Sequence, residues 1–452
     1  MLAGAGCASH ATKMSSTMGA YTAGQYVQAE TSAADLTADH GPGDNDRLLY
    51  LLEAGQILTA TGKASESQKY LAEAQEIVAP YLDEKSDVSV SQTAASTILN
   101  PTVATYVGTG YDRVMMSTLQ ATNAMLMSDP AAARVEFNRA RNWQEDLKLN
   151  NARRIEEAQK SVEEEGSSQG FSTSSVTANA NVSAALDRQY GVVRNLRGYA
   201  GYVVPYTQHL SGVFRLSLGT SSDANQAASE FRQVAGVLTG PAKEAVLEDV
   251  ARARSRSVGA NLAPSTYVYF MTGLAPSRDQ FTLRFPVPIG GKIIWVVAAF
   301  PTLELHEDYV SSFAVDGAAG KAVTITDMDG VVGQAFSDAL PAVIAQSVVS
   351  AAIKGAGQYA MNEALGGWGG LAGAVLTELT TAADLRAWET LPKQIQYLRL
   401  DTPGDGKIRI KGGGRNLGVV EVSPGKDNVV WVTVPSSSAS PARATAALWE
   451  AQ

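Results

Sequence analysis

The sequence predicts an α+β protein: an N-terminal TPR-like (tetratricopeptide-like) α-solenoid, followed by a β-rich, sandwich-like domain with an inserted helical hairpin. Three observations predict this fold. Small residues recur seven positions apart within helical patterns in the N-terminal half. After about residue 262, β-branched and aromatic runs replace the helical spacing. Residues 331–390 then interrupt these runs with an apolar stretch that again has helical spacing.

Length and composition set limits on fold and partners. A chain of 452 residues is long enough for at least two hydrophobic cores. Its 45% hydrophobic content, with 18% charged residues, is typical of a folded protein. A nucleic-acid-binding surface needs clustered Lys and Arg, so a net charge of -9 and a pI near 5.1 argue against one. We therefore expect no nucleic-acid partner.

Residues 1–12 have the character of a lipoprotein signal remnant or leader. The small residues Ala3-Gly-Ala-Gly6 directly precede Cys7, which is the single cysteine of the chain. Small side chains are required before the cysteine at a lipoprotein cleavage site, and the cysteine is then acylated. We predict lipidation of Cys7 and an outer-membrane lipoprotein facing the periplasm. Because the basic and most of the apolar part of a signal are missing, a chance cysteine in a small-residue leader is the alternative.

Residues 13–160 carry the first TPR-like helical repeats. In such repeats small residues occupy the positions where two helices cross closely, and larger apolar residues fill the grooves between neighbours. The best copy begins at Leu48, with small residues at Gly55, Gly62, Ser67 and Ala74. Its apolar positions are Leu51, Leu58 and Leu71, and Pro80 ends its second helix.

Further copies keep the same offsets. One has Ala121, Ser128, Ala133 and Ala140 at the small positions, with Phe137 in the place of Leu71. Residues 161–181 are polar and low in complexity, and we expect a flexible linker or loop there. TPR-like helices continue over residues 182–262, where Gly212 and Gly219 repeat the seven-residue spacing before Ala227 and Phe231. An incidental bundle of Ala-rich helices is the alternative.

The remaining residues are predicted from changes in pattern. A β-rich region spans residues 263–330, and strands over residues 391–436 complete the same antiparallel, sandwich-like domain. Between them, residues 331–390 predict a helical hairpin with a break at Gly366–Gly370. Its apolar stretch is interrupted by Lys354 and Glu363, which favours core packing over membrane insertion. Residues 437–452 are a Ser/Pro/Ala-rich tail.

A solenoid of this kind presents its recognition residues on its concave face, which the first helix of each pair lines. Polar and aromatic side chains on those helices are therefore candidates for binding a partner, with ordinary helix packing as the alternative. The candidate partner-binding residues are Tyr50, Gln56, Gln120, Asn123, Tyr206 and His209.

Catalytic and metal-binding motifs do not meet their structural requirements. Gly166–Gly170 matches G-x-S-x-G but lies in the predicted linker, where no strand precedes the serine. Asp327–Gly330 begins like a calcium loop but lacks the rest of it. The cluster at His306, Glu307 and Asp308 is typical of a solvated strand end, and the histidines are too scattered for a zinc site. We predict no catalytic residues, no cofactor and no metal.

The arrangement resembles a family of uncharacterised bacterial lipoproteins with tetratricopeptide-like helices and a β-rich C-terminal region. The resemblance implies this architecture and a cell-envelope location, and it supplies no activity or catalytic residues. The matching segments cover most of the chain in order: Tyr111–Met115, Asp129–Phe137, His209–Phe214, Thr272–Pro276 and Ala383–Pro392.

The function expected from these features is that of a non-catalytic scaffold or adaptor. It would be anchored by lipid in the bacterial cell envelope and would dock an unknown protein or peptide on its helical array. One alternative is an envelope enzyme or enzyme activator in cell-wall or polysaccharide metabolism, with its site in the β-rich region. Another is a structural subunit of a secretion or surface machine.

Overall fold

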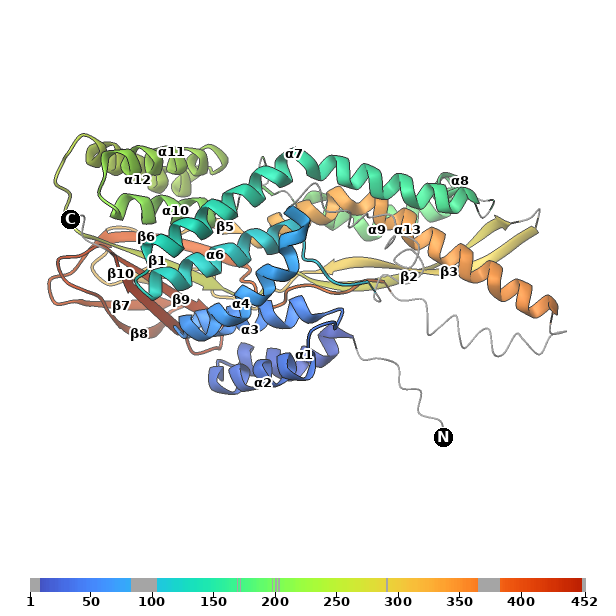
Figure 1. The fold of residues 1–452 in the computed structure, drawn as a ribbon, viewed down its shortest axis with the longest axis horizontal. Coiled ribbons are helices and arrows are strands. Elements are labelled where there is room, and N and C mark those ends of the chain that lie inside the picture. Colours follow the sequence, from blue (N-terminus) through green and yellow to red (C-terminus); the bar gives the residue numbers. More distant parts are fainter. Residues whose placement is uncertain are drawn as a thin grey trace.

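The protein is a mixed α+β structure with helices mainly in the N-terminal part and strands mainly in the C-terminal part. The computed structural model describes residues 9–82, 104–168, 170, 172–196, 198–199, 201, 204–289, 292–364 and 383–448. Figure 1 shows an elongated molecule with a wide body at one end and a narrower arm at the other. We call these two parts the body and the arm.

Paired helices form much of the body. Each pair consists of two consecutive helices joined by a short turn. The helices of the body are α1 (His10–Thr22), α2 (Tyr26–Asp39), α3 (Arg47–Ala60), α4 (Ala64–Val78), α6 (Gly110–Leu126), the first half of α7 (Pro130–Ser168), α10 (Pro205–Ser217), α11 (Ser221–Val237) and α12 (Gly240–Ser257), with a short 3-10 turn at Ala79–Leu82.

Two glycines allow helices of a pair to cross closely, as the sequence predicted. A Cβ atom on Gly55 of α3 would lie 2.5 Å from the Leu71 side chain of α4. A Cβ on Gly212 of α10 would lie 2.6 Å from the ring of Phe231 in α11. Carbon atoms do not approach this closely without a shift of the neighbour, so both positions require glycine.

The second residue of each seven-residue spacing lies in the turn that ends the first helix. Gly62, Ser128 and Gly219 all have positive φ angles, of 78°, 58° and 76°. Such left-handed residues commonly end helices, and glycine adopts this conformation without a steric penalty. The three pairs α3–α4, α6–α7 and α10–α11 therefore share one local geometry, although a serine holds the position in the second pair.

Among the described residues, eight strands form the sheets of the body. A five-stranded sheet has the order β10-β9-β1-β6-β5, and a three-stranded sheet has the order β4-β7-β8. Strands β1 and β9 are parallel, so the five-stranded sheet is mixed, whereas the sequence predicted an antiparallel sheet. The strands are β1 (Ser265–Thr272), β4 (Phe313–Val315), β5 (Val323–Asp327), β6 (Gln394–Asp401), β7 (Lys407–Gly412), β8 (Arg415–Glu421), β9 (Asn428–Val434) and β10 (Ala442–Ala447).

Both faces of the five-stranded sheet are covered. Along β1, Val268 and Phe270 belong to the core shared with the three-stranded sheet. Tyr267, Tyr269 and Met271 alternate with them and belong to the core shared with the helices. Because successive side chains of a strand point to opposite faces, a strand covered on both sides is apolar throughout. This accounts for the continuous burial of β1 and β9.

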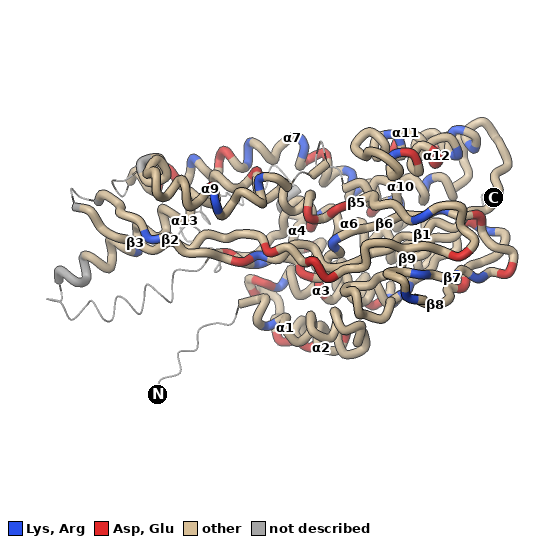
Figure 2. The backbone as a smooth tube through the Cα atoms, turned by 180° about the vertical axis from the view of Figure 1, so that it is seen from behind, with Lys and Arg blue, Asp and Glu red and all other residues tan. Residues whose placement is uncertain are grey.

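The arm has a hydrophobic core of its own. It combines the second half of α7 with α8 (Thr173–Thr177), α9 (Ala180–Asn195), the hairpin of β2 (Ser277–Ile289) and β3 (Lys292–Glu304), and α13 (Met328–Ala364). Figure 2 shows few charged residues along β2, β3 and α13. Within α13, Met328–Tyr359 has the length and apolarity of a membrane-spanning helix, and part of it is buried in the arm core.

Three segments differ from their sequence predictions: the linker at residues 161–181, the tail at residues 437–452 and the helical hairpin at residues 331–390. The predicted linker at residues 161–181 is largely helical, because α7 continues to Ser168 and α8 follows, with Val162 and Val176 buried in the arm core. The predicted tail contains β10, whose alternate residues Ala442, Ala444 and Ala446 are buried. Alanine alternation gives only a weak strand signal, which explains the second difference.

Of the predicted helical hairpin, the described residues include the first helix. In the structure, α13 runs as one helix from Met328 to Ala364 with Pro341 inside it. The predicted break at Gly366–Gly370 and the residues after it, up to residue 382, lie outside the described residues. Residues 383–390, which we expected to be helical, have no regular secondary structure.

Candidate functional site

Two adjoining cavities form a groove where the arm joins the body. The first has a volume of about 290 Å³ and the second of about 210 Å³. They have Thr109, Arg278 and Val343 in common among their lining residues. Cavities of about 300 to 1,000 Å³ are typical of small-molecule sites, so each is near the lower end of that range. We call the two together the junction groove.

One face of α13 forms the floor of the junction groove. Lining residues recur along this helix at intervals of three or four, at Val332, Ala335, Phe336, Ala339, Val343, Gln346, Ser347, Ser350, Ala351 and Lys354. Residues with this spacing lie on the same side of an α-helix. The N-terminal part of the face is apolar, and serine, glutamine and lysine replace the apolar residues toward Lys354.

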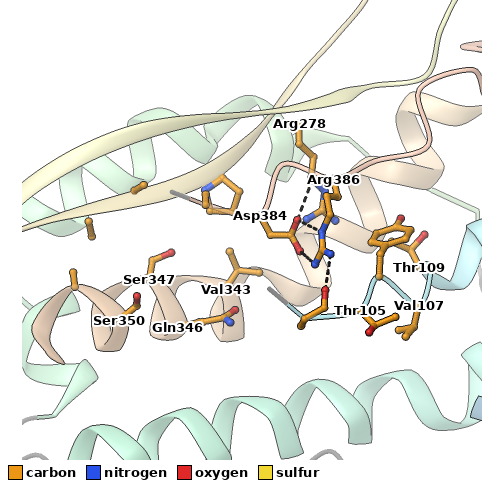
Figure 3. A pocket seen from close by; sticks show the side chains of 18 of the residues that line it. Thr105, Val107, Thr109, Arg278, Val343, Gln346, Ser347, Ser350, Asp384 and Arg386 are labelled. Atoms are coloured by element: carbon orange, nitrogen blue, oxygen red, sulfur yellow. Dashed lines mark hydrogen bonds and ion pairs between the residues drawn. The ribbon is translucent and has the colours of Figure 1, made fainter. Parts of the chain in front are cut away.

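The first cavity combines apolar walls with most of the charged side chains of the groove. Figure 3 shows Gln346, Ser347 and Ser350 on the helix side, with Arg278, Asp384 and Arg386 on the opposite side. Arg386 forms a two-atom ion pair with Asp384, at 2.9 Å from Nε and 2.8 Å from an Nη, and also donates to the Ala104 carbonyl at 2.6 Å. Lys354 adds a third cation to this cavity, and burial lowers its pKa.

The second cavity is apolar. Its walls come from α6, α7, the segment before α10, and α13, and its apolar lining consists of Tyr111, Leu147, Ile155, Tyr199, Val204, Val331, Val332, Ala335, Phe336, Ala339 and Val343. Burial raises the pKa of the Tyr111 hydroxyl to about 12, so this group is neutral at physiological pH. Arg278 is the only charged lining residue among those described for this cavity.

Arg278 stands at the junction of the two cavities. It belongs to β2, is half-buried, and has its guanidinium 5.6 Å from the centre of the Phe336 ring. It also lies beside the Tyr111 hydroxyl. No carboxylate in the described part of the chain lies within ion-pair distance of it: Asp384 is paired with Arg386, and Asp112, which attracts Arg278 from farther away, accepts from Tyr106 and Thr109.

The walls of the groove are fixed by contacts that the sequence analysis missed. Glu53 of α3 is fully buried and accepts hydrogen bonds from the backbone N–H groups of Glu389 at 2.7 Å and Thr390 at 3.0 Å. Burial raises the pKa of Glu53 to about 8, and the nearby Glu389 carboxylate adds to the rise. Arg386 also pairs with Asp46 at 3.2 Å. These contacts attach the segment after residue 382 to the body.

The six candidate partner-binding residues lie inside the protein. Tyr50, Gln56, Gln120, Asn123, Tyr206 and His209 are each at most 2% exposed. Tyr50 stacks on His40 with ring centres 4.4 Å apart, and Asn123 donates to Ser67 at 2.8 Å. Because the first helices of the pairs pack against the sheet and against other helices, a partner cannot reach these side chains in this arrangement. We therefore do not assign the binding surface to them.

One of these residues, His209, belongs to a buried polar network between helices and sheet. His209 of α10 bonds Tyr269 of β1 at 2.8 Å through Nδ1 and Asp249 of α12 at 3.1 Å through Nε2. The Tyr397 hydroxyl donates to Asp249 at 2.7 Å, and Arg399 pairs with the same carboxylate at 2.8 Å. A buried carboxylate requires such partners, so the network joins α10 and α12 to the sheet.

The structure also shows the surroundings of the sequence motifs that were considered for catalysis or metal binding. Gly166 lies within the helix α7, so no strand leads into Ser168. Asp329 pairs with Lys393, and His306 bonds Ser277 at 3.1 Å. In the described residues, no group of three or more His, Cys, Asp or Glu side chains is arranged to hold a metal ion. Cys7 lies outside the described residues.

Comparison with known proteins adds no relative. No protein-family model, no curated protein and no solved structure matches this chain. The resemblance to a lipoprotein family stays a prediction, and the case for function depends on the geometry of the junction groove.

Proposed function

We propose that this protein is a non-catalytic binding scaffold with TPR-like helix pairs, held in the bacterial cell envelope by a lipid on Cys7. Its partner is a protein or peptide of the envelope. The shared geometry of the three helix pairs, with close crossings at Gly55 and Gly212, supports the repeat assignment. The lipid anchor rests on the small residues that precede Cys7.

The observation that carries this proposal is the junction groove itself. The face of the helix array that solenoids use for recognition is filled here by the protein's own sheet, as the burial of Tyr206 and His209 illustrates. The groove is therefore the candidate binding site for the partner, because cationic side chains and apolar walls from the body and the arm meet there. Ligand sites occur preferentially where two structural units meet.

Site-specific photocrosslinking in living cells tests the proposal. A benzophenone amino acid replaces Val107, which lines the groove, and in a control it replaces Val258, which is 84% exposed at the end of α12. We expect a discrete adduct from position 107 and none from position 258. Absence of a groove-specific adduct contradicts the scaffold, as does turnover of peptidoglycan or a glycan by the purified protein.

The anchor is tested separately, by labelling cells with radioactive palmitate. We expect label in the full-length protein and none in the Cys7→Ala variant. Equal labelling of the two proteins, or no labelling of either, contradicts the lipid anchor and leaves the groove unaffected.

A further inference from the structure

We propose that the junction groove binds a single-chain acyl anion, with its charged head at Arg278 and its chain in the apolar cavity. The proposal goes beyond the proposed function, because it adds a small-molecule ligand inside the groove to the protein partner, which contacts the groove at Val107. A free fatty acid and a one-chain phospholipid such as lysophosphatidate share this chemistry.

The first argument concerns the charge of Arg278. A half-buried guanidinium usually has a carboxylate partner, because removing a charge from water is costly. Arg278 has no such partner among the described residues, while its neighbour Arg386 has both Asp384 and Asp46. A guanidinium can bind a carboxylate or a phosphate through two parallel hydrogen bonds. An anionic head at this point would supply the missing partner.

The second argument concerns the shape of the apolar cavity. Its lining along α13 runs from Val331 to Val343, which is roughly 18 Å of helix at 1.5 Å per residue. The apolar lining therefore extends along enough of the helix for an acyl chain to lie beside it.

The third argument distinguishes an acyl chain from a peptide. A peptide buried in the cavity would need a partner for each N–H and C=O group. The polar groups available there are few, and two are already used: Tyr199 accepts from the Asp327 N–H at 2.9 Å, and Gln334 donates to Asp338 at 2.7 Å. A polymethylene chain makes no such demand and gains from burial of its apolar surface.

The first cavity, on the other side of Arg278, fits the head of the ligand. Its charged lining side chains are Arg278, Lys354, Arg386 and Asp384, of which three are cationic. Serine and glutamine side chains of α13 face the same space. A head group there lies near these cations, and the serine and glutamine side chains that replace apolar residues along α13 set the direction in which the ligand lies.

The test is a fluorescence titration of the full-length protein with cis-parinaric acid, followed by displacement with hexadecanoate, lysophosphatidate, octanoate and hexadecanol. We expect saturable binding, displacement by hexadecanoate or lysophosphatidate or both, and weaker displacement by octanoate because of its shorter chain. Arg278→Gln is expected to weaken anion binding by about tenfold or more, since hydrogen bonds to charged groups contribute that much. It should leave hexadecanol displacement unchanged.

Arg284→Gln is the matched control. Arg284 lies on the same strand and is exposed, stacks on Trp295 at 5.5 Å, and lines neither cavity, so its loss should not change binding. Ala339→Phe fills the apolar cavity and should abolish binding, with Ala335→Leu as a second filling variant if the first fails to fold. Equal effects of the two arginine variants, displacement by hexadecanol as strong as by hexadecanoate, or no saturable binding would each overturn the proposal.

These outcomes separate the ligand from the scaffold. A crosslinked partner at position 107 without acyl-anion binding overturns the ligand alone. Acyl-anion binding that depends on Arg278, without any crosslinked protein, overturns the scaffold function alone.

Discussion

Replacement of Gly212 by alanine tests the close crossing of α10 and α11. The added Cβ would lie 2.6, 2.9 and 2.9 Å from three ring atoms of Phe231, whose side chain is fully buried. The ring cannot retreat without disturbing the core around it, and overpacking of this kind costs up to about 3 kcal/mol. Alanine gains about 1 kcal/mol over glycine in a helix. The free energy of unfolding should therefore fall by about 2 kcal/mol.

Gly236→Ala in α11 is the matched control. Gly236 is exposed in the same helix pair, and no atom lies within 4 Å of a Cβ built there. The helix propensity of alanine then acts alone, and stability should rise by up to about 1 kcal/mol. The two variants change the same residue type in the same pair and are expected to shift stability in opposite directions.

Hydrogen exchange of the α10 and α11 amides measures the effect, because it reports local opening free energies in a protein too large for two-state unfolding. The double variant Gly212→Ala/Phe231→Leu should recover much of the loss, since a smaller side chain then faces the new methyl group. If Gly212→Ala protects these amides as well as the wild type does, the close crossing is not a structural requirement and the inferred repeat geometry fails.

Three further predictions concern charged residues. Glu53 has a pKa raised from 4.5 to about 8, so its contribution to stability is fully present below pH 4.5 and is lost as the pH rises through about 8. Hydrogen exchange of the α3 amides in wild type and Glu53→Gln across this range should show a pH dependence that is larger in the wild type by on the order of 5 kcal/mol, because Glu389, whose pKa is also raised, titrates in both proteins; parallel curves would contradict it. Asp249→Asn removes the buried carboxylate that His209, Tyr397 and Arg399 share, while Arg399 keeps Glu248, and should lower the local stability by about 1 to 3 kcal/mol in hydrogen exchange of the α12 amides; unchanged exchange would refute this role of the network. Arg284→Gln should change stability by less than about 1 kcal/mol, because the arginine is exposed and contributes mainly its contact with Trp295; a larger loss in hydrogen exchange of the β2 amides would show that this contact is underestimated.

Local sequence patterns predicted the helix pairs because the relevant physics is local. Gly55 and Gly212 precede their contacts Leu71 and Phe231 by fewer than twenty residues, and the turn residues follow each first helix at a fixed distance. The runs of β1 and β9 were likewise recognised as strands from their apolar composition. The parallel pairing of these two strands was missed, because the residues that pair are far apart in the sequence.

The junction groove could not be predicted for the same reason. Arg278 carries no motif, and it becomes notable only because β2 places it between Tyr111 of α6 and Phe336 of α13. In the sequence, Glu53 is an ordinary charged residue of a predicted helix. Its role depends on the backbone N–H groups of Glu389 and Thr390, which the fold brings against it. The six predicted binding residues were assigned to a free concave face, and the sheet that covers this face comes from a later part of the chain.

The position of the groove follows from the place of α13 in the sequence, between two neighbouring strands of the five-stranded sheet. Strands β5 and β6 are antiparallel neighbours, and α13 follows β5 directly, so the chain leaves the sheet for the arm before it returns in β6. The arm packs around its own core, and the body around others. The groove is lined by members of both, such as Tyr111 of the body and Phe336 of the arm, and the cavities lie where the two cores meet. A ligand in the groove contacts both units, so its binding should stabilise the attachment of arm to body in proportion to its concentration.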